Sequence, residues 1–453
     1  MNYLSIVLFL ILQSCVGYSQ DLIGSWSGKL DFGVQKLTFV VHVNQTDGKW
    51  IAKADSPDQS AFGIPFQIDV KGDSIFLNNP KGISLKLKHG DDGKLEGHFS
   101  QNGMTIPVVL VKGAAVIQPK NSLKFQTPKQ PYVYDTVDVV IPNTYSDINL
   151  AGTITKPKAK GKYPAVILVT GSGPQDRDET LFGHKPFKVL ADYLTQNGII
   201  VLRYDDRGVN KSGGSFEKST IDDFSKDALS ALDFLKKQPN VDINTIGIIG
   251  HSEGGLIANL LAGQGVPNLS FIVTLAAPTI PIRDLMVEQL YSVGKSEGMS
   301  EFQLAMAKEI NKKNFDVVKS NLNTDEAYVQ LKKNMNIVEE SDKNAAIRKE
   351  MLTLLAPAYR YFVRIDPTNF IKKIYIPVFG AFGTLDVQVP STLNLRGYHD
   401  NLPENSKTVL KEYDGMNHLF QKANTGKVSE YAQIDETINE QVLKDIAGWI
   451  KGL

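Results

Sequence analysis

The chain has 453 residues, of which 42% are hydrophobic and 22% are charged, a composition typical of a soluble globular protein with two or three domains. Its 49 Lys and Arg residues balance its 49 Asp and Glu residues, so the overall charge gives no indication of a nucleic-acid partner. The single cysteine, Cys15, excludes an intramolecular disulfide and a cysteine-based metal cluster.

Residues 1–20 predict an export signal. Tyr3 to Leu12 is almost wholly apolar and too short to span a bilayer, although no Lys or Arg precedes it. Cleavage near Ser19 would release a soluble protein. Alternatively, Leu12-Gln-Ser-Cys15 resembles a lipobox with an unusual Gln, and Cys15 would then carry a lipid anchor. We favour plain secretion and expect a periplasmic or secreted protein without a membrane span, with the lipoprotein as the alternative.

Residues 21–113 predict a small all-β domain. Short runs that alternate in polarity or are β-branched are separated by turn signals such as Asp47-Gly48 and Asn79-Pro80. This spacing indicates a barrel or a sandwich, and Gly24 to Leu30 resembles the first strand of lipocalin-like barrels. We expect side chains to fill the interior, although a ligand pocket is the alternative. Three histidines of this domain lack metal-ligand spacing: His42, His89 and His98.

Residues 114–131 contain three prolines among polar residues and predict a linker. From residue 132 onward, strands alternate with helical patterns, which predicts an α/β domain built on a doubly wound, mostly parallel sheet. The expected strands lie at 132–141, 148–155, 165–170, 199–204, 246–249, 271–275, 376–383 and 407–413. The expected helices lie at 187–196, 221–237, 256–262 and 438–450.

Residues 281–365 show helical periodicity without a convincing strand. An all-helical insert between two strands of a sheet indicates a cap over the site at the sheet edge. The end of the insert, residues 358–363, is rich in aromatic side chains, which can line an acyl pocket. Tyr359 and Tyr361 are therefore candidate substrate-binding residues. The alternative is that these side chains only pack the cap onto the sheet.

The stretch Gly250-His-Ser-Glu-Gly254 carries the strongest catalytic signal. A short apolar run precedes it and predicts a buried parallel strand, and a helical pattern follows it. Strand, sharp turn and helix are the context of the G-x-S-x-G nucleophile elbow, which holds the serine at its apex. Ser252 is therefore the candidate nucleophile, and the backbone N–H of Glu253, at the start of the helix, is a candidate oxyanion donor.

A nucleophilic serine needs a histidine as base and an acid that orients the histidine, and on this type of sheet both follow the serine in the order acid, histidine. Asp386 lies just after one expected strand, and His418 lies just after the next. Both side chains should therefore reach the edge where Ser252 emerges. A helix N-cap is the alternative role for Asp386, and a surface position is the alternative for His418. The rival residues are Asp284, Asp366 and His399.

A second oxyanion donor is expected in the loop after the strand at 165–170. Gly171-Ser-Gly173 allows a close approach of the backbone, so the N–H of Ser172 is the candidate, with Gly173 as the less favoured one. The charged residues that follow, 176–178, are expected to lock this loop by ion pairing rather than to touch substrate. Residues 205–208 predict a structural turn.

The second half of the chain resembles the α/β-hydrolase superfamily over residues 132–453, and within it capped bacterial serine esterases of the S33-type or esterase-like group. The matching motifs are Gly171-Ser-Gly-Pro-Gln-Asp-Arg-Asp178, Asp206-Arg-Gly208, Gly250-His-Ser-Glu-Gly-Gly255, Asp386-Val-Gln-Val-Pro390 and Asn417-His-Leu-Phe420. The resemblance implies hydrolysis of small carboxylic esters, with short to medium acyl groups, through an acyl-enzyme and without metal or cofactor. Thr170 stands where many members carry a histidine, which leaves the hydrogen bonding of the adjacent loop open.

Other functions remain open at this point. Relatives in the superfamily include aminopeptidases, acylaminoacyl peptidases and thioesterases, and Glu253 could serve an aminopeptidase as the acidic anchor for an amine. A binding protein with an inert hydrolase domain is a further alternative, which an intact set of Ser252, Asp386 and His418 disfavours. The role of the β domain and the oligomeric state, a homodimer included, stay open.

Overall fold

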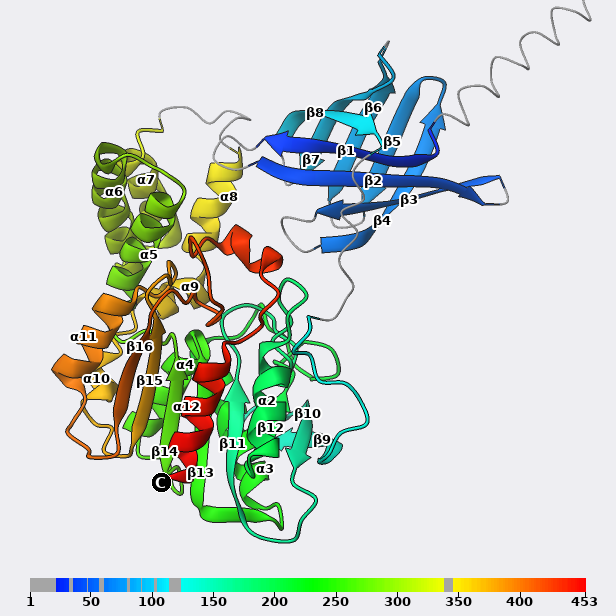
Figure 1. Ribbon diagram of the computed structural model, residues 1–453. Coiled ribbons are helices and arrows are strands. Elements are labelled where there is room, and N and C mark those ends of the chain that lie inside the picture. The colour runs from blue at the N-terminus through cyan, green and yellow to red at the C-terminus, as the bar shows by residue number, and fades with distance from the viewer. Residues whose placement is uncertain are drawn as a thin grey trace, which may run out of the picture. The chain divides into compact units, whose positions relative to one another are not determined.

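The computed structural model describes residues 22–31, 36–46, 48–56, 61–79, 82–90, 92–101, 104–113, 124–337 and 345–453. The expected export signal with Cys15, and residues 114–123 of the expected linker, lie outside the described residues. The chain divides into two compact units: a β domain, with which the described residues 345–350 are grouped, and a larger unit that contains the remaining described residues from 124 onward (Figure 1). Across the described ranges, no helix combines the length and the apolar character needed to cross a membrane.

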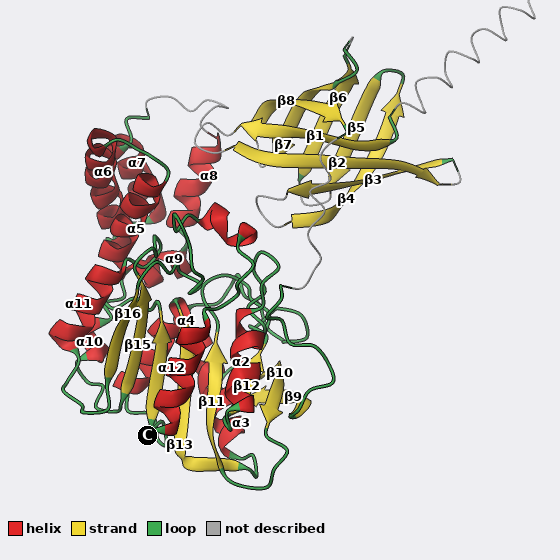
Figure 2. Ribbon diagram, in the orientation of Figure 1, coloured by secondary structure: helices red, strands yellow, loops and turns green. Residues whose placement is uncertain are grey.

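The β domain is a closed barrel of eight antiparallel strands (Figure 2). The strands are β1 (Gly24–Asp31), β2 (Lys36–Thr46), β3 (Lys49–Ser56), β4 (Ala61–Lys71), β5 (Ser74–Asn79), β6 (Ile83–His89), β7 (Leu95–Gln101) and β8 (Met104–Lys112). Each strand pairs with the next in sequence, and β1 pairs with β8 to close the ring. The expected small all-β domain is thus confirmed as a barrel.

The barrel interior is filled by side chains, as the alternating sequence pattern predicts. In β6, Leu85 and Leu87 point inward and are buried, whereas Lys86 and Lys88 are exposed. The inward side chains of all eight strands form one apolar cluster around Phe39 and its neighbours. This filled core matches the preferred interpretation over a ligand pocket.

The larger unit is built on an eight-stranded sheet with the order β16-β15-β14-β13-β11-β12-β10-β9. The strands are β9 (Asp135–Asn143), β10 (Ile148–Lys156), β11 (Tyr163–Val169), β12 (Ile200–Tyr204), β13 (Val241–His251), β14 (Phe271–Leu275), β15 (Val378–Gly383) and β16 (Val409–Tyr413). The six strands β11 to β16 run parallel, and β9 and β10 are antiparallel additions at one edge. The expected doubly wound, mostly parallel sheet is confirmed.

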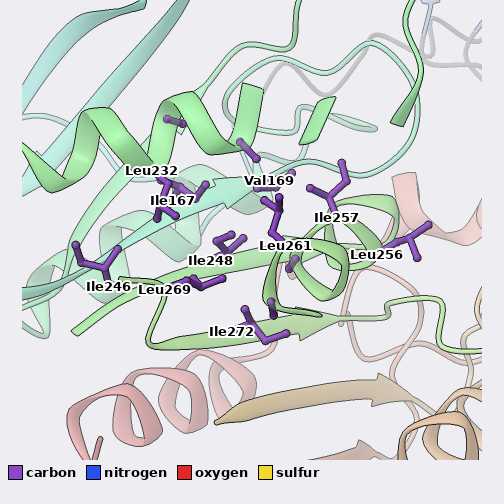
Figure 3. Packing of buried hydrophobic residues seen from close by; sticks show 14 of the residues in the cluster. Ile167, Val169, Leu232, Ile246, Ile248, Leu256, Ile257, Leu261, Leu269 and Ile272 are labelled. Carbon is purple, nitrogen blue, oxygen red and sulfur yellow. The ribbon is translucent and has the colours of Figure 1, made fainter. Parts of the chain in front are cut away.

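Helices cover both faces of this sheet, which explains why its central strands are apolar on both sides. In β11, Ile167 and Val169 belong to the core that includes α3 (Ile221–Lys236) and α4 (Glu253–Gly263), and Figure 3 shows this packing. Val166 and Leu168 of the same strand face the opposite core, which includes α2 (Pro186–Gln196) and α12 (Glu440–Lys451). Alternate residues of a strand thus face opposite sides of the sheet, and this alternation sets the direction of each side chain at the strand ends.

The helical insert begins after β14 and supplies most of the remaining helices. It contains α5 (Ile282–Ser296), α6 (Glu301–Lys319), α7 (Thr324–Asn334), α8 (Ala345–Leu354) and α9 (Pro357–Val363). Two further helices, α10 (Thr368–Ile371) and α11 (Ser391–Asn401), precede and follow β15 and were not expected. His399, a rival base, therefore lies in α11 rather than in a loop.

The described end of the expected linker is attached to the larger unit. The Nζ atom of the buried Lys124 donates to the carbonyls of Ala432 and Ile434, at 3.0 and 2.5 Å. Gln126 accepts from the backbone N–H of Ile438 at 3.1 Å and donates to its carbonyl at 2.8 Å. These residues are therefore a structural part of the unit, in contrast to the free linker that their composition predicts.

Candidate active site

Ser252 stands at the turn between β13 and α4, as the elbow motif predicts. Its φ of 53° and ψ of −115° lie in a region of backbone conformation that residues other than glycine rarely adopt. The turn is held by the N–H of Ser252, which donates to the carbonyl of Leu275 at 2.8 Å, and by its carbonyl, which accepts from Gly255 at 2.9 Å. The strained backbone therefore presents the hydroxyl at the carboxyl edge of the sheet.

The two glycines of the motif are required by close backbone approach. A Cβ atom on Gly250 would lie 2.1 Å from the carbonyl oxygen of Gly254, and one on Gly254 would lie 2.1 Å from that of Val169. Both distances are far below van der Waals contact, so any larger residue would push α4 away from the strands. Local sequence thus dictates the sharp strand-to-helix turn.

His418 and Asp386 meet at this edge although 32 residues separate them in the chain. The Nδ1 atom of His418 lies 2.7 Å from Oδ2 of Asp386, and both side chains are buried. The other carboxylate oxygen of Asp386 accepts from the backbone N–H groups of Gln388 and Val389, each at 2.8 Å. The acid is thus held in place and orients the imidazole, with Nε2 left without a hydrogen-bond partner among the described residues.

The rival residues are occupied elsewhere. Asp284 pairs with its neighbour Arg283 at 2.7 Å and its side chain is 49% exposed. Asp366 accepts from the N–H and the hydroxyl of Thr368 at the start of α10. No described residue is hydrogen-bonded to Ser252 Oγ, so contact between this hydroxyl and His418 is not yet made; such bonds often tighten only when substrate binds.

The loop after β11 lies against the elbow. A Cβ atom on Gly171 would come within 3.3 Å of Ser252 Cβ, which shows how closely the two backbones approach. In the part of the chain that the structure describes, the N–H groups of Ser172 and Glu253 have no protein acceptor. Both candidate oxyanion donors are therefore unoccupied.

Carboxylates hold the oxyanion loop in place, which answers the question raised by Thr170. The Thr170 hydroxyl donates to Asp206 Oδ1 at 2.8 Å, and the N–H of Gln175 donates to Asp206 Oδ2 at 3.0 Å. The N–H of Gly171 donates to Oε1 of Glu179 at 2.8 Å. Thus Asp206, expected only in a structural turn, also fastens the loop that follows Thr170.

Two of the charged residues 176–178 form the expected ion pairs, whereas Asp176 accepts hydrogen bonds from the N–H of Asp178 and from Thr180 within the same loop. Arg177 forms a two-pronged contact with the buried Asp205, with distances of 3.0 and 2.7 Å. Asp178 pairs with Arg203 and, at 3.1 Å, with Lys185. The nearby turn is anchored in the same way, through Arg207 and the buried Asp227 at 2.7 Å.

Two acids beside the elbow, the buried Asp206 and the partly buried Glu253, have raised pKa values. Burial raises the pKa of Glu253 to about 7. Burial also raises the pKa of Asp206 to about 7, against the opposing hydrogen bonds from Gln175 and Thr170 and with support from the charges of Glu179 and Glu253. Both side chains line a cavity of about 10 Å³ beneath the oxyanion loop, near the lower limit for one water molecule.

His251, which precedes the nucleophile, packs against the candidate base. Its ring centre lies 4.8 Å from that of His418, and its Nε2 lies 3.0 Å from the backbone carbonyl oxygen of His418. Its Nδ1 lies 2.8 Å from Oε1 of Glu179. Sequence reasoning missed the pairing of His251 with Glu179, because the two residues are 72 positions apart in the chain. The presence of a histidine inside the elbow motif was the only available signal.

Of the two tyrosines proposed for substrate binding, Tyr361 is engaged elsewhere. Its hydroxyl donates to Oδ2 of Asp222, in the first turn of α3, at 2.7 Å. Burial, the hydrogen bond and the charge of Asp222 raise the pKa of Tyr361 to about 12. This contact fastens α9 of the helical insert to α3, which packs on the sheet. It therefore favours a packing role for Tyr361. Tyr359 packs near Phe362, and its role in substrate binding stays a prediction.

Comparison with known proteins places the chain among hydrolases. The family of X-Pro dipeptidyl-peptidases (S15 family) matches residues 146–412, a range that includes Ser252 and Asp386 and ends before His418. Esterase EstD of Thermotoga maritima is 29% identical over 334 residues, which cover 70% of this chain and 70% of the esterase. Dipeptidyl-peptidase 5 of Porphyromonas gingivalis is 33% identical over 107 residues, 23% of this chain and 15% of that protein.

A solved esterase of Pyrococcus furiosus covers 70% of this chain and 91% of its own, with 18% sequence identity and a TM-score of 0.43. Within the described ranges, no group of three or more His, Cys, Asp or Glu residues is arranged to hold a metal ion. The α/β-hydrolase resemblance is confirmed, and S15 is the family to which the match points. Because this match spans more than half of its length, the chain belongs to the X-Pro dipeptidyl-peptidase (S15) family, whose relatives hydrolyse esters or peptides.

Proposed function

We propose that the protein is a serine hydrolase that cleaves small carboxylic esters through an acyl-enzyme, with Ser252 as nucleophile, His418 as general base and Asp386 as the acid that orients His418. The observation that carries this proposal is the buried 2.7 Å contact between His418 and Asp386, placed at the sheet edge where the elbow presents Ser252. Three independent segments of the chain meet there in the order that this type of sheet requires.

The proposed reaction begins when Ser252 Oγ attacks the ester carbonyl carbon and passes its proton to Nε2 of His418. The carbonyl oxygen becomes an oxyanion, which the N–H groups of Glu253 and Ser172 are free to bind. The alcohol leaves with the proton from His418, and an acyl-enzyme remains. Water then attacks this acyl-enzyme with His418 again as base, which releases the acid and restores Ser252.

The choice of esters over peptides rests on the extent of the similarity. EstD is matched over 70% of its length, whereas dipeptidyl-peptidase 5 is matched over only 15%. Cleavage of peptides after proline is the second candidate, because the matched family is described by that activity. Short to medium acyl groups are the expected substrates, and export to the periplasm or exterior remains part of the proposal.

The test combines labelling with a substrate panel. The purified protein should react with a fluorophosphonate, and mass spectrometry should find the adduct on Ser252. Turnover of p-nitrophenyl esters from acetate to decanoate should exceed that of an Xaa-Pro p-nitroanilide. Labelling with faster cleavage of the Xaa-Pro amide would replace the esterase proposal by the peptidase. Absence of labelling would overturn the serine mechanism itself.

A further inference from the structure

Glu179 is a buried carboxylate at the junction of three segments of the candidate site. Its side chain is 4% exposed, and one oxygen, Oε1, accepts both the N–H of Gly171 at 2.8 Å and the Nδ1 proton of His251 at 2.8 Å. Gly171 opens the oxyanion loop, and His251 directly precedes Ser252. One carboxylate oxygen therefore ties the oxyanion loop to the elbow.

His251 extends this connection to the third segment. Its Nε2 donates to the backbone carbonyl of His418 at 3.0 Å, and the two rings pack at 4.8 Å with a tilt of 51°. When Glu179 is ionised, both partners of His251, a carboxylate and a carbonyl, only accept hydrogen bonds, so both ring nitrogens must donate and this arrangement requires the cationic ring. Burial alone would lower the pKa of His251, but the charge and hydrogen bond of Glu179 outweigh burial and raise it.

We infer that Glu179 and His251 are positioning residues for the hydrolytic reaction, which hold the oxyanion loop, the nucleophile turn and the loop of the base in one fixed arrangement. This inference rests on the proposed function of Ser252 and His418. A charge-assisted hydrogen bond between buried partners is shorter and stronger than a neutral one, which suits a contact that must fix geometry. Neither residue touches the reacting atoms; each acts through Gly171 or His418.

The geometry explains why this connection matters. We call the hydrogen bonds of Glu179 and His251 to Gly171 and to the His418 carbonyl the brace. The candidate oxyanion donor at Ser172 follows Gly171 directly, so a shift of Gly171 moves this donor. A displacement of about 1 Å in a catalytic arrangement can cost about 100-fold in rate, and loss of one oxyanion donor costs about 100- to 1,000-fold in kcat. The contacts of the brace should therefore matter most when charge develops on the oxyanion.

The test uses Glu179→Gln, which keeps an oxygen for Gly171 but cannot pair with a cationic ring. We expect kcat for p-nitrophenyl butyrate, per site titrated with fluorophosphonate, to fall about 10- to 100-fold with little change in KM. Inhibition by a trifluoromethyl ketone, which forms an oxyanion on the serine, should weaken in parallel. Inhibition by butyramide, whose carbonyl oxygen stays neutral, should change little. If Glu179 only stabilised the fold, Glu179→Gln would not weaken the trifluoromethyl ketone while sparing the inhibitor that forms no oxyanion.

His251 supplies a second, independent pair of variants. Asn can place an amide nitrogen near the position of Nδ1 and so retain the contact with Glu179, whereas Gln can place one near Nε2 and retain the contact with the His418 carbonyl. Both should show the same loss in kcat with KM preserved, because each breaks one link of the brace. If Glu179→Gln does not fold, these two variants carry the test.

The matched control is Asp178→Asn in the same loop. Asp178 is also a partly buried carboxylate, but it pairs with Arg203 and Lys185 and not with the catalytic segments. It should leave the ratio of trifluoromethyl ketone to butyramide affinity unchanged. An equal effect of Asp178→Asn, or wild-type kcat in Glu179→Gln, would overturn the inference. If the wild-type protein neither reacts with the fluorophosphonate nor cleaves esters, the proposed function fails instead.

Discussion

The sheet edge and the cap of the larger unit are built on different principles. At the edge, side chains from distant segments are fixed by buried contacts below 3 Å, such as His418 to Asp386 and His251 to Glu179. In the cap, large apolar side chains are left in solvent: Phe302 is 75% exposed and Val329 is 66% exposed. Chemistry needs atoms held at fixed distances, whereas substrate selection tolerates a surface that can adapt. We therefore expect substitutions at the edge to change kcat and substitutions in the cap to change selectivity.

The largest effect is expected at the nucleophile. Ser252→Ala should lower kcat by about 10⁶-fold, as in other serine triads, because no other described side chain offers a hydroxyl at the elbow. The measurement is ester turnover by a folded, purified variant, with circular dichroism as the folding check. Turnover near the wild-type level would mean that the chemistry lies elsewhere and would remove the basis of the comparison.

The second effect tests the order of the triad. Asp386→Asn should preserve the fold but misorient His418, and kcat should fall by about 10⁴-fold, the size found when a serine-protease triad acid is changed to its amide. Asp284→Asn is the control, because the adjacent Arg283 is the one ion-pair partner of its half-exposed side chain within the described ranges. If Asp284→Asn proved the damaging change, the acid would come from the start of the cap.

The third effect concerns how rigidly the sheet edge is held. Its measure is the dependence of the free energy of unfolding on pH. His184 is fully buried and lies 2.9 Å from the Thr437 hydroxyl and 3.1 Å from the Tyr431 carbonyl; burial lowers its pKa from 6.5 to about 4. Between pH 6.5 and 4 the unfolded chain binds a proton that the folded chain does not. The free energy of unfolding therefore falls as the pH falls through this window, by about 2 kcal/mol between pH 7 and 5.

This contribution should disappear in His184→Gln. The decline in unfolding free energy between pH 7 and 5, measured by urea denaturation, should become smaller by about 2 kcal/mol. His399→Gln is the control, because it removes an exposed histidine of the same unit. Identical pH slopes for wild type and His184→Gln would show that His184 is solvated, and that the edge is less rigid than its contacts indicate.

The smallest effect is expected in the cap. Tyr359→Ala or Tyr361→Ala should change the ratio of kcat/KM between short and long acyl esters by about 3- to 10-fold, the range of one hydrogen bond. Labelling of Ser252 should persist. Tyr361→Phe separates two causes, since it removes only the hydrogen bond to Asp222. Unchanged ratios in all three variants would show that the cap does not select the acyl group.

Sequence alone predicted the parts of the site that depend on local chemistry or on strand order. The elbow is local, because only glycine fits at positions 250 and 254, and Asp386 and His418 follow from the rule that loops after parallel strands meet at one edge. The pairing of Glu179 with His251 could not be predicted, because it depends on how a loop folds back across 72 residues. No periodicity or spacing in the sequence encodes such a contact.

The unexpected helix α11 shows the same limit for the fold. Its segment contains Gly397 in its interior, where glycine disfavours a helix, so local propensity indicates a loop. The structure gives the reason: a Cβ atom at this position would lie 2.4 Å from the hydroxyl oxygen of Thr279. Close packing of α11 against the loop that follows β14 therefore requires glycine here, and packing is not visible in a single sequence.

The two units also differ in whether their sheets have exposed edge strands, and exposed edges affect solubility. The closed barrel has no free strand, whereas the sheet has two edge strands, β16 and β9, and the outer side of β9 offers unpaired backbone groups to any neighbouring strand. β9 carries Asp135 and Asp138, and Pro142 lacks the N–H that such pairing requires. Two carboxylates and a proline oppose the docking of another copy along this edge. At this one of its two edges, the sheet thus resists edge-to-edge aggregation.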